Sequence, residues 1–597
     1  MICNDSSCLV RTNTVVHSPP IVFAIFSCLA ITSYGMPVTA QTVAPAQPAP
    51  PPNIPSPEEQ SLPSPETIPE EVPSSPEEVQ IEIEQPSVNP PNVLNLDVCP
   101  PLAETSELSF LATEIRVVGN TVLADQIAKQ VDCYLGQEIR LSDLFNLRSR
   151  ITKLYLDEGY ITSGAFVPNN QDLTNGSVEI QVIEGEIEEL QINGLDRLRK
   201  GYVSDRLARA MESPFRQQDL ERGLQLLQVD PMLQRVNAEL TAGNGPGKSL
   251  LILDLEEADT FGLSFAGDNY RSPSIGSEGI NVGLSVSHPL GIGDRFNASY
   301  GRTEGLDLYD VSYSVPVNAQ DGTLRLRASN SDSRIVQDAF RDIDIRSETT
   351  TLSAGFRQPL VRTPSEEFAL GLDFDWKRSR SFILDDIPFS FSLGPEDGRS
   401  QVSAVRFYQD WVKRSQSQVL AARSQFSVGL DLFDATVNDS GIDGRFFIWL
   451  GQFQWIKQVS PRFLMLTRVG AQLTPDALLP IERFSLGGIS TIRGYSQNQI
   501  VTDNAITSSI ELRIPITKDP NKVQLTPFFE AGVGWNNEIP DPDPAFLASL
   551  GLGVRWAVSP WLSMRLDYGI PLVDVDNTGD SLQEDGLYFL LDYRPQF

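Results

Sequence analysis

The sequence predicts α+β repeats followed by a transmembrane β-barrel of about 16 antiparallel strands. Three observations carry this prediction. Between residues 99 and 258, a pattern of strand, helix, helix, strand, strand occurs twice. From residue 259 to residue 597, apolar and polar residues alternate in one segment after another. The polar face of that alternation carries charged residues, and the chain ends in an aromatic-rich strand.

Residues 1–40 have the layout of a secretory signal peptide. The apolar run Ile21–Ile31 is followed by a small residue, Ala40, at the expected cleavage site. A membrane anchor is the alternative, but the run is shorter than the ~20 residues that a spanning helix needs. We therefore expect export.

Residues 41–98 are rich in Pro, Glu, Gln and Ser, and no Lys or Arg lies between Arg11 and Arg116. Such a composition cannot bury enough apolar surface to offset the entropy lost on ordering. We expect a disordered linker, in which the apolar patch Val79–Ile83 fits a transient strand.

Two repeats of about 70 residues follow, close to the lower size limit of a self-supporting core. The first spans residues 99–185, with strands expected at 114–118, 164–167 and 177–183 and helices at 127–131 and 141–156. The second spans 186–258, with strands at 190–193, 236–240 and 249–255 and helices at 203–211 and 219–227. The edge strands of such units can accept an unfolded chain as an additional strand.

The region 259–597 alternates with the period of a β-strand. Leu370, Leu372, Phe374 and Trp376 share one face, whereas Asp373, Asp375 and Lys377 share the other. A soluble sandwich would also alternate, but its packed core could not hold charges such as Arg325 and Arg327. A barrel with a water-filled lumen can hold them.

Composition excludes several functions. The formal net charge of -32 argues against a nucleic-acid partner, and the two His residues leave little room for a His-based metal site or catalytic triad. The segment 242–249 satisfies a loose phosphate-binding-loop pattern ending in Lys248-Ser249. That mechanism requires a helix directly after the Lys, whereas Leu250–Leu255 is an apolar run. We interpret the segment as a turn between two strands, and expect no nucleotide, cofactor or metal.

The stretch Phe484–Tyr495 interrupts the strand pattern. Gly487 and Gly488 permit backbone angles that other residues avoid, and Gly494 lies between a cation, Arg493, and an aromatic ring, Tyr495. An ordinary glycine-rich loop between strands is the alternative interpretation.

The phrase Ile492-Arg493-Gly494-Tyr495 resembles the signature loop of the superfamily that contains outer-membrane insertases and two-partner-secretion transporters. The resemblance implies that this loop folds into the barrel lumen and that its Arg pairs with the acid of a Phe-x-Asp-x-Gly strand motif. Here the corresponding residues are Phe528, Glu530 and Gly532, so the acid is one methylene longer. An Arg–carboxylate pair is planar and two-pronged, which suits a latch.

The repeats resemble POTRA domains of the ShlB/FhaC/HecB haemolysin secretion/activation family. The phrases that carry this resemblance are Tyr155-x-x-x-Gly159-Tyr160-x-Thr162 and Glu184-Gly185. The terminal strand, with Tyr593 and Phe597 on one face, resembles the sorting signal of outer-membrane barrels.

Cysteine usage allows two interpretations. After removal of the signal peptide the chain retains Cys99 and Cys133. Exported proteins commonly pair such residues, and family members often have Cys at matching places, which together imply a disulfide. The alternative is two separate thiols.

The resemblance implies a non-enzymatic outer-membrane transporter with periplasmic POTRA domains. It would bind an unfolded secreted partner, such as a large adhesin or haemolysin, and pass it through the barrel to the cell surface. Outer-membrane lipid and, during biogenesis, the barrel-assembly machinery would be further partners. A BamA-like insertase is the alternative, although insertases usually carry more POTRA units. A passive porin or membrane-bound enzyme does not explain the repeats.

Overall fold

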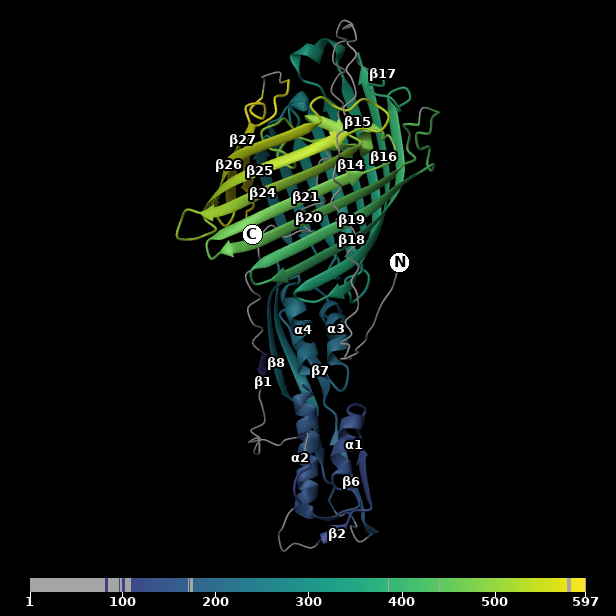
Figure 1. Cartoon of the computed structure of the whole chain (residues 1–597), viewed down its shortest axis with the longest axis vertical. Coiled ribbons are helices and arrows are strands. Elements are labelled where there is room, and N and C mark those ends of the chain that lie inside the picture. Colours follow the sequence, from purple (N-terminus) through teal and green to yellow (C-terminus); the bar gives the residue numbers. More distant parts are fainter. Residues whose placement is uncertain are drawn as a thin grey trace, which may run out of the picture. The chain divides into compact units, whose positions relative to one another are not determined.

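Two small α+β domains and a closed β-barrel make up the described chain (Figure 1). The computed structural model describes residues 81–83, 96, 99–102, 109–169, 171, 175–384, 386–439, 441–576 and 581–595. The expected signal peptide, most of the expected linker and Phe597 lie outside these residues.

The first domain places two helices against a three-stranded sheet of order β3-β6-β5. Its elements are β2 (Ser109–Leu111), β3 (Glu114–Val118), α1 (Ala124–Asp132), β4 (Glu138–Arg140), α2 (Leu141–Asp157), β5 (Gly164–Phe166) and β6 (Ser177–Ile183). The apolar residues of α2, including Leu147 and Ile151, pack on Val178 and Ile180 of β6. The paired strands β2 and β4 were not predicted, because three-residue strands are too short to show a period.

The second domain repeats this arrangement with β7 (Glu186–Asn193), α3 (Lys200–Leu207), the short 3₁₀ helix η3 (Ala208–Met211), α4 (Gln217–Gln228), β8 (Leu233–Ala242) and β9 (Lys248–Glu257). The predicted turn between Ala242 and Lys248 is confirmed, since β8 and β9 pair as an antiparallel hairpin across it.

One segment of the expected linker is ordered as a strand. β1 (Ile81–Ile83) pairs in parallel with β8, so that the sheet order is β1-β8-β9-β7. This strand lies within the apolar patch Val79–Ile83, the part of the linker in which a transient strand was expected. The physical reason is that the edge of β8 offers unpaired backbone groups that an extended segment can satisfy.

The barrel strands follow one another around the wall in chain order (Figure 1). They are β10 (Phe261–Asp268), β11 (Gly279–Ser287), β12 (Arg295–Arg302), β13 (Leu306–Pro316), β14 (Thr323–Arg334), β15 (Arg346–Arg362), β16 (Glu366–Ile383), β18 (Arg399–Ser415), β19 (Gln418–Leu430), β20 (Phe447–Ser460), β21 (Phe463–Leu473), β24 (Asn504–Pro515), β25 (Val523–Trp535), β26 (Phe546–Ser559), β27 (Leu562–Pro571) and β28 (Leu587–Tyr593). The two-residue β17 (Ile387–Pro388) pairs only with β16. The wall therefore has 16 strands, and β10 pairs with β28 to close it.

The predicted alternation has the predicted orientation. Leu372 and Leu566 are 54% and 48% exposed on the outer face. On the inner face, Asp375 and Arg327 form ion pairs with Arg406 and Asp310. Charges facing inward and apolar side chains facing outward are the arrangement of a membrane barrel. Separately, no helix among the described residues is long and apolar enough to span a membrane.

Candidate functional site: the lumen loop and its anchors

The connection between β21 and β24 is buried although it is a loop. It contains a 3₁₀ turn, η6 (Pro480–Glu482), and a small hairpin of β22 (Phe484–Leu486) with β23 (Ile500–Thr502). We call residues 474–503 the lumen loop, because its side chains bond to inward-facing residues of the barrel wall. Leu486, Ile492, Tyr495 and Ile500 form an apolar cluster with Leu547 of β26.

Arg493 is the most heavily bonded side chain of the lumen loop and is 1% exposed. Its Nε and Nη2 donate to Glu530 Oε1 at 3.0 and 2.6 Å, and its backbone N–H donates to Glu530 Oε2 at 2.7 Å. The structure thus joins the two residues that the sequence pairs, with Glu in place of the usual Asp. One carboxylate thus accepts hydrogen bonds from both the guanidinium and the backbone of Arg493.

The other two residues of the strand motif also contact the loop. The guanidinium carbon of Arg493 lies 3.5 Å from the centroid of the Phe528 ring, a cation–π contact. A Cβ on Gly532 would lie 2.9 Å from Cδ1 of Ile492. The motif therefore supplies a ring to stack on, an acid to pair with and space for Ile492, all from the inward face of β25.

Two further acids share Arg493, and sequence reasoning missed both. Nη1 donates to Glu511 Oε2 at 3.0 Å and to Asp567 Oδ1 at 2.9 Å. These acids lie on β24 and β27, and each also pairs with Arg565 of β27. Alternation along β27 places Asp567 on the inward face, but only the barrel closure shows which inward residues meet.

Gly494 and Tyr495 hold the loop backbone against the last strands. Gly494 has φ +98° and lies so close to Gly569 of β27 that a Cβ would approach its carbonyl carbon to 3.1 Å. The Gly494 N–H donates to the Tyr588 hydroxyl at 3.0 Å. The Tyr495 hydroxyl donates to the carbonyl oxygen of Ala548 at 2.7 Å. The Ile-Arg-Gly-Tyr phrase is therefore a docking element along its whole length.

A second anchor, unpredicted from the sequence, lies at the other end of the loop. Glu482 accepts hydrogen bonds from Arg406 Nη2 at 2.7 and 3.0 Å and lies 3.2 Å from Lys377 Nζ. Arg406 is on β18 and Lys377 is on β16, whereas Arg493 is bound by β24, β25 and β27. Because strand order follows the wall, the loop is tied to two well-separated arcs of the barrel.

The POTRA signature residues meet at the joint between the two α+β domains. Tyr155 donates to Glu184 Oε1 at 2.7 Å, and a Cβ on Gly185 would lie 1.9 Å from the Thr162 hydroxyl oxygen. The carbonyls of Gly159 and Gly185 accept hydrogen bonds from the second domain, from the backbone N–H groups of Gln217 and Phe215, and Arg216 lies over the Tyr160 ring. The signature therefore shapes an interdomain joint.

The charge state of Glu184 follows from this packing. Burial alone would raise its pKa, but hydrogen bonds from the hydroxyls of Thr121 and Tyr155 and from the backbone N–H groups of Thr121 and Val122 outweigh burial and lower the pKa. Burial and the neighbouring carboxylate raise the pKa of Tyr155. Glu184 is therefore an ionised acceptor that ties Thr121, Val122 and Tyr155 together within the first domain, next to the joint.

The remaining predicted residues lie at the two ends of the folded chain. Cys99 and Cys133 are joined in a disulfide with a Cα–Cα distance of 5.4 Å. Tyr593 faces outward, 38% exposed, and its ring packs near those of Phe265 and Trp561. No group of His, Cys, Asp and Glu among the described residues is arranged to hold a metal ion.

Two protein-family models match this chain. The model for haemolysin secretion/activation protein ShlB/FhaC/HecB matches residues 247–556, and the model for the POTRA domain, ShlB-type, matches residues 110–185. The chain belongs to the haemolysin secretion/activation family. It is an outer-membrane transporter of the two-partner-secretion type, with POTRA domains in the periplasm. The insertase alternative is accordingly set aside.

Known relatives agree with this assignment. The heme/hemopexin transporter protein HuxB of Haemophilus influenzae is 24% identical over 450 residues, which cover 72% of this chain and 76% of HuxB. The outer membrane transporter CdiB of Dickeya dadantii is 24% identical over 482 residues, covering 78% of this chain and 83% of that protein. The solved structure of CdiB from Escherichia coli superposes with a TM-score of 0.62 at 22% identity, over 84% of this chain and 94% of CdiB, and shows the same fold.

Proposed function

We propose that the POTRA domains of this transporter capture an unfolded secreted partner by adding it as a strand to the edge of β8. The observation that carries this proposal is the pairing of Ile81, Glu82 and Ile83 with Ala238, Glu239 and Leu240. This edge already accepts an extended segment through backbone groups. Such pairing depends weakly on side chains, which suits the recognition of an unfolded chain. The partner would displace β1 and take its place.

The captured chain then passes through the barrel after the lumen loop moves aside. The loop is tied to β16 and β18 through Glu482 and to β24, β25 and β27 through Arg493. A translocating polypeptide needs the space that this loop fills. Release of one anchor would let the loop swing while the other retains it.

We further propose that transport involves no covalent chemistry and no nucleotide. The periplasm has no ATP pool, so folding of the partner outside the cell would supply the free energy for translocation. The partner would be a large adhesin- or haemolysin-like protein. The terminal strand with Tyr593 would direct assembly of the barrel by the barrel-assembly machinery, and the outer wall would contact membrane lipid.

The capture step is testable with an engineered disulfide. Glu82 and Glu239 are Cα partners in the parallel pair, and neighbouring strands lie about 4.8 Å apart, within the range that a disulfide bridges. The variant Glu82→Cys/Glu239→Cys should trap β1 on β8 when oxidised and reduce secretion at least tenfold. Both single-Cys variants are the controls and should secrete normally.

Secretion is measured with the large exported protein expected in the neighbouring reading frame. Mass spectrometry verifies the cross-link, and the heat-modifiable mobility of the barrel verifies folding. Normal secretion by the fully cross-linked protein would show that the partner does not use the β8 edge.

A further inference from the structure

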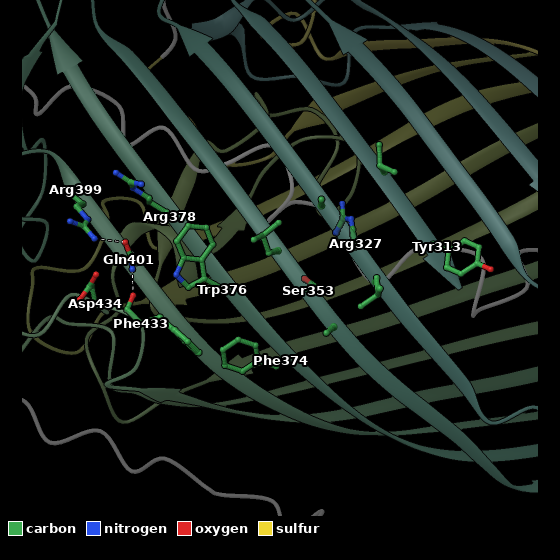
Figure 2. Close-up of a pocket in the computed structure, with 15 residues that line it drawn as sticks. Tyr313, Arg327, Ser353, Phe374, Trp376, Arg378, Arg399, Gln401, Phe433 and Asp434 are labelled. Carbon is green, nitrogen blue, oxygen red and sulfur yellow. Dashed lines mark hydrogen bonds between the residues drawn. The ribbon is translucent and has the colours of Figure 1, made fainter. Parts of the chain in front are cut away.

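The outer surface of the barrel wall has a groove that crosses strands β13 to β18. Its volume is about 830 Å³, and Ala328 and Ala354 belong to its lining. Figure 2 draws the lining residues, with Phe374 and Trp376 among those labelled. Larger apolar side chains flank these alanines: Leu326, Leu352, Phe374 and Trp376. Leu326 and Leu352 are 59% and 47% exposed, so the groove lies on the face that meets lipid. A second hollow of about 400 Å³ continues it, sharing Tyr313, Leu326, Ala354 and Phe374.

The register of β16 places this groove in the membrane. Phe368, Leu370, Leu372, Phe374, Trp376 and Arg378 share one face of the strand. The rise from Phe368 to Arg378 is about 25 Å along the barrel axis, from ten residues at ~3.3 Å and a tilt of ~40°. This equals the height of the apolar band of an outer-membrane barrel. Trp376 therefore lies at the aromatic girdle, and Arg378 lies just beyond the apolar band.

Strand direction identifies the leaflet. β10 begins directly after β9 of the second POTRA domain, so β10 starts at the periplasmic side. Six antiparallel steps separate β10 from β16, so β16 runs in the same direction. Its end, with Arg378, is thus extracellular, and the groove opens to the outer leaflet.

A short segment after β19 forms one wall of the groove. Phe433 and Asp434 have φ +53° and +58°, a left-handed backbone that bulky residues rarely adopt. The Ser403 hydroxyl donates to the Leu432 carbonyl at 2.8 Å, and the Gln401 amide donates to the Phe433 carbonyl. The Phe433 ring, with the residue 67% exposed, packs edge-on against Phe374 at 5.8 Å. The barrel thus holds an aromatic side chain against its own lipid-facing surface.

The extracellular end of the groove is cationic. Arg378 and Arg399 lie together there, beside Gln401 (Figure 2). Arg399 Nη2 donates to Gln401 Oε1 at 2.6 Å, and Arg378 Nε is buried without a hydrogen-bond partner. No carboxylate of the described chain forms an ion pair with either Arg, and Asp434 is the one acid in the lining. Two cations against one anion leave this end ready to accept a further negative charge.

We propose that this groove binds a phosphate-bearing, acylated lipid of the outer leaflet, the chemistry of lipid A. A lipid phosphate lies against Arg378 and Arg399, whose planar guanidinium groups match phosphate oxygens. An acyl chain runs along Ala328 and Ala354 between the larger side chains. The position within the apolar band selects a lipid rather than a soluble anion or a peptide, because lipid is what surrounds this wall.

The test uses the full-length protein in detergent and native mass spectrometry. Wild-type protein is titrated with bis-phosphorylated lipid A and with the same lipid after removal of its phosphates. We expect the phosphorylated lipid to bind at least tenfold more tightly. The variant Arg378→Gln/Arg399→Gln should lose that difference, and Ala354→Trp, which fills the groove, should weaken both lipids.

Arg302→Gln is the matched control. Arg302 lies at the extracellular end of β12 opposite the outward-facing Ile280, and its Nε lies 3.8 Å from Asp307 Oδ1. It lies outside the groove, and its substitution should leave binding unchanged. Equal wild-type affinity for the two lipids would overturn the proposal even if the double variant failed to fold. An unchanged phosphate preference in the folded double variant, or an equal loss in Arg302→Gln, would also overturn it.

Discussion

Replacing Arg493 by alanine removes one cation from a buried cluster of six charged side chains. Arg493, Arg513 and Arg565 form ion pairs with Glu511, Glu530 and Asp567. In Arg493→Ala, Glu530 loses the one ion pair that it forms among the described residues. That carboxylate stays buried, and the bonds from the Arg493 side chain to the wall are lost together, whereas the Glu482 and Tyr495 contacts remain.

The magnitude follows from the cost of breaking a buried pair, about 3–5 kcal/mol. At about 1.36 kcal/mol for each factor of ten, the ratio of docked to released loop falls roughly 200- to 5,000-fold. We expect Arg493→Ala to insert as a normal barrel, to release its loop and to lose at least tenfold in secretion. Glu530→Gln should loosen the loop less, because Arg493 keeps Glu511 and Asp567.

Maleimide labelling of a buried loop position measures the release. Ser485 is 8% exposed on β22, so Ser485→Cys reacts only when the loop opens. Labelling should accelerate at least 100-fold in Arg493→Ala and by a smaller factor in Glu530→Gln. Labelling at the wild-type rate in Arg493→Ala would refute the latch. Equal acceleration in both variants would refute sharing of Arg493 among three acids.

Three further predictions concern the other anchors and the joint. Glu482→Gln should destabilise the docked loop by about 3 kcal/mol, the lower end of the ~3–5 kcal/mol range for a broken buried pair, because Arg406 keeps its ion pair with Asp375. The Ser485→Cys labelling assay measures this change. An unchanged labelling rate would show that Glu482 does not hold the loop in place. The folded-state pKa of Glu184 lies below its ordinary 4.5, so its carboxylate stabilises the fold above that pH and this stabilisation is lost as the pH falls. Glu184→Gln should therefore lower the melting temperature at neutral pH, and the melting temperature of the variant should fall less than that of the wild type as the pH is lowered. Melting temperatures equal to those of the wild type at every pH would contradict this. Cys133→Ser should lower the free energy of unfolding by about 4 kcal/mol, since the bridge closes a loop across 34 residues; denaturant unfolding of the first domain measures the loss, and a loss under ~1 kcal/mol would contradict the estimate.

The strand pattern and the order of elements could be predicted because they depend on neighbours along the chain. Alternation at 370–377 requires only that β16 have one wet and one lipid face, and the structure has those faces. The pairing of Arg493 with Glu530 could also be predicted, because each residue lies in a short sequence motif that resembles one of the family. The three-residue strands β2 and β4 were not, because three residues show no period.

The sequence by itself determined the barrel, the two repeats, the turn at 242–248 and the loop phrase around Arg493. Only the tertiary structure decided that Glu511 and Asp567 share Arg493, that Glu482 meets Arg406, and that Ile81–Ile83 lie on β8. The alternation of apolar and polar residues along a strand indicates which of its faces contacts water, and it can be read from neighbouring residues in the sequence. Which wet faces meet depends on strand register, barrel closure and the path of the loop, which join residues far apart in the chain.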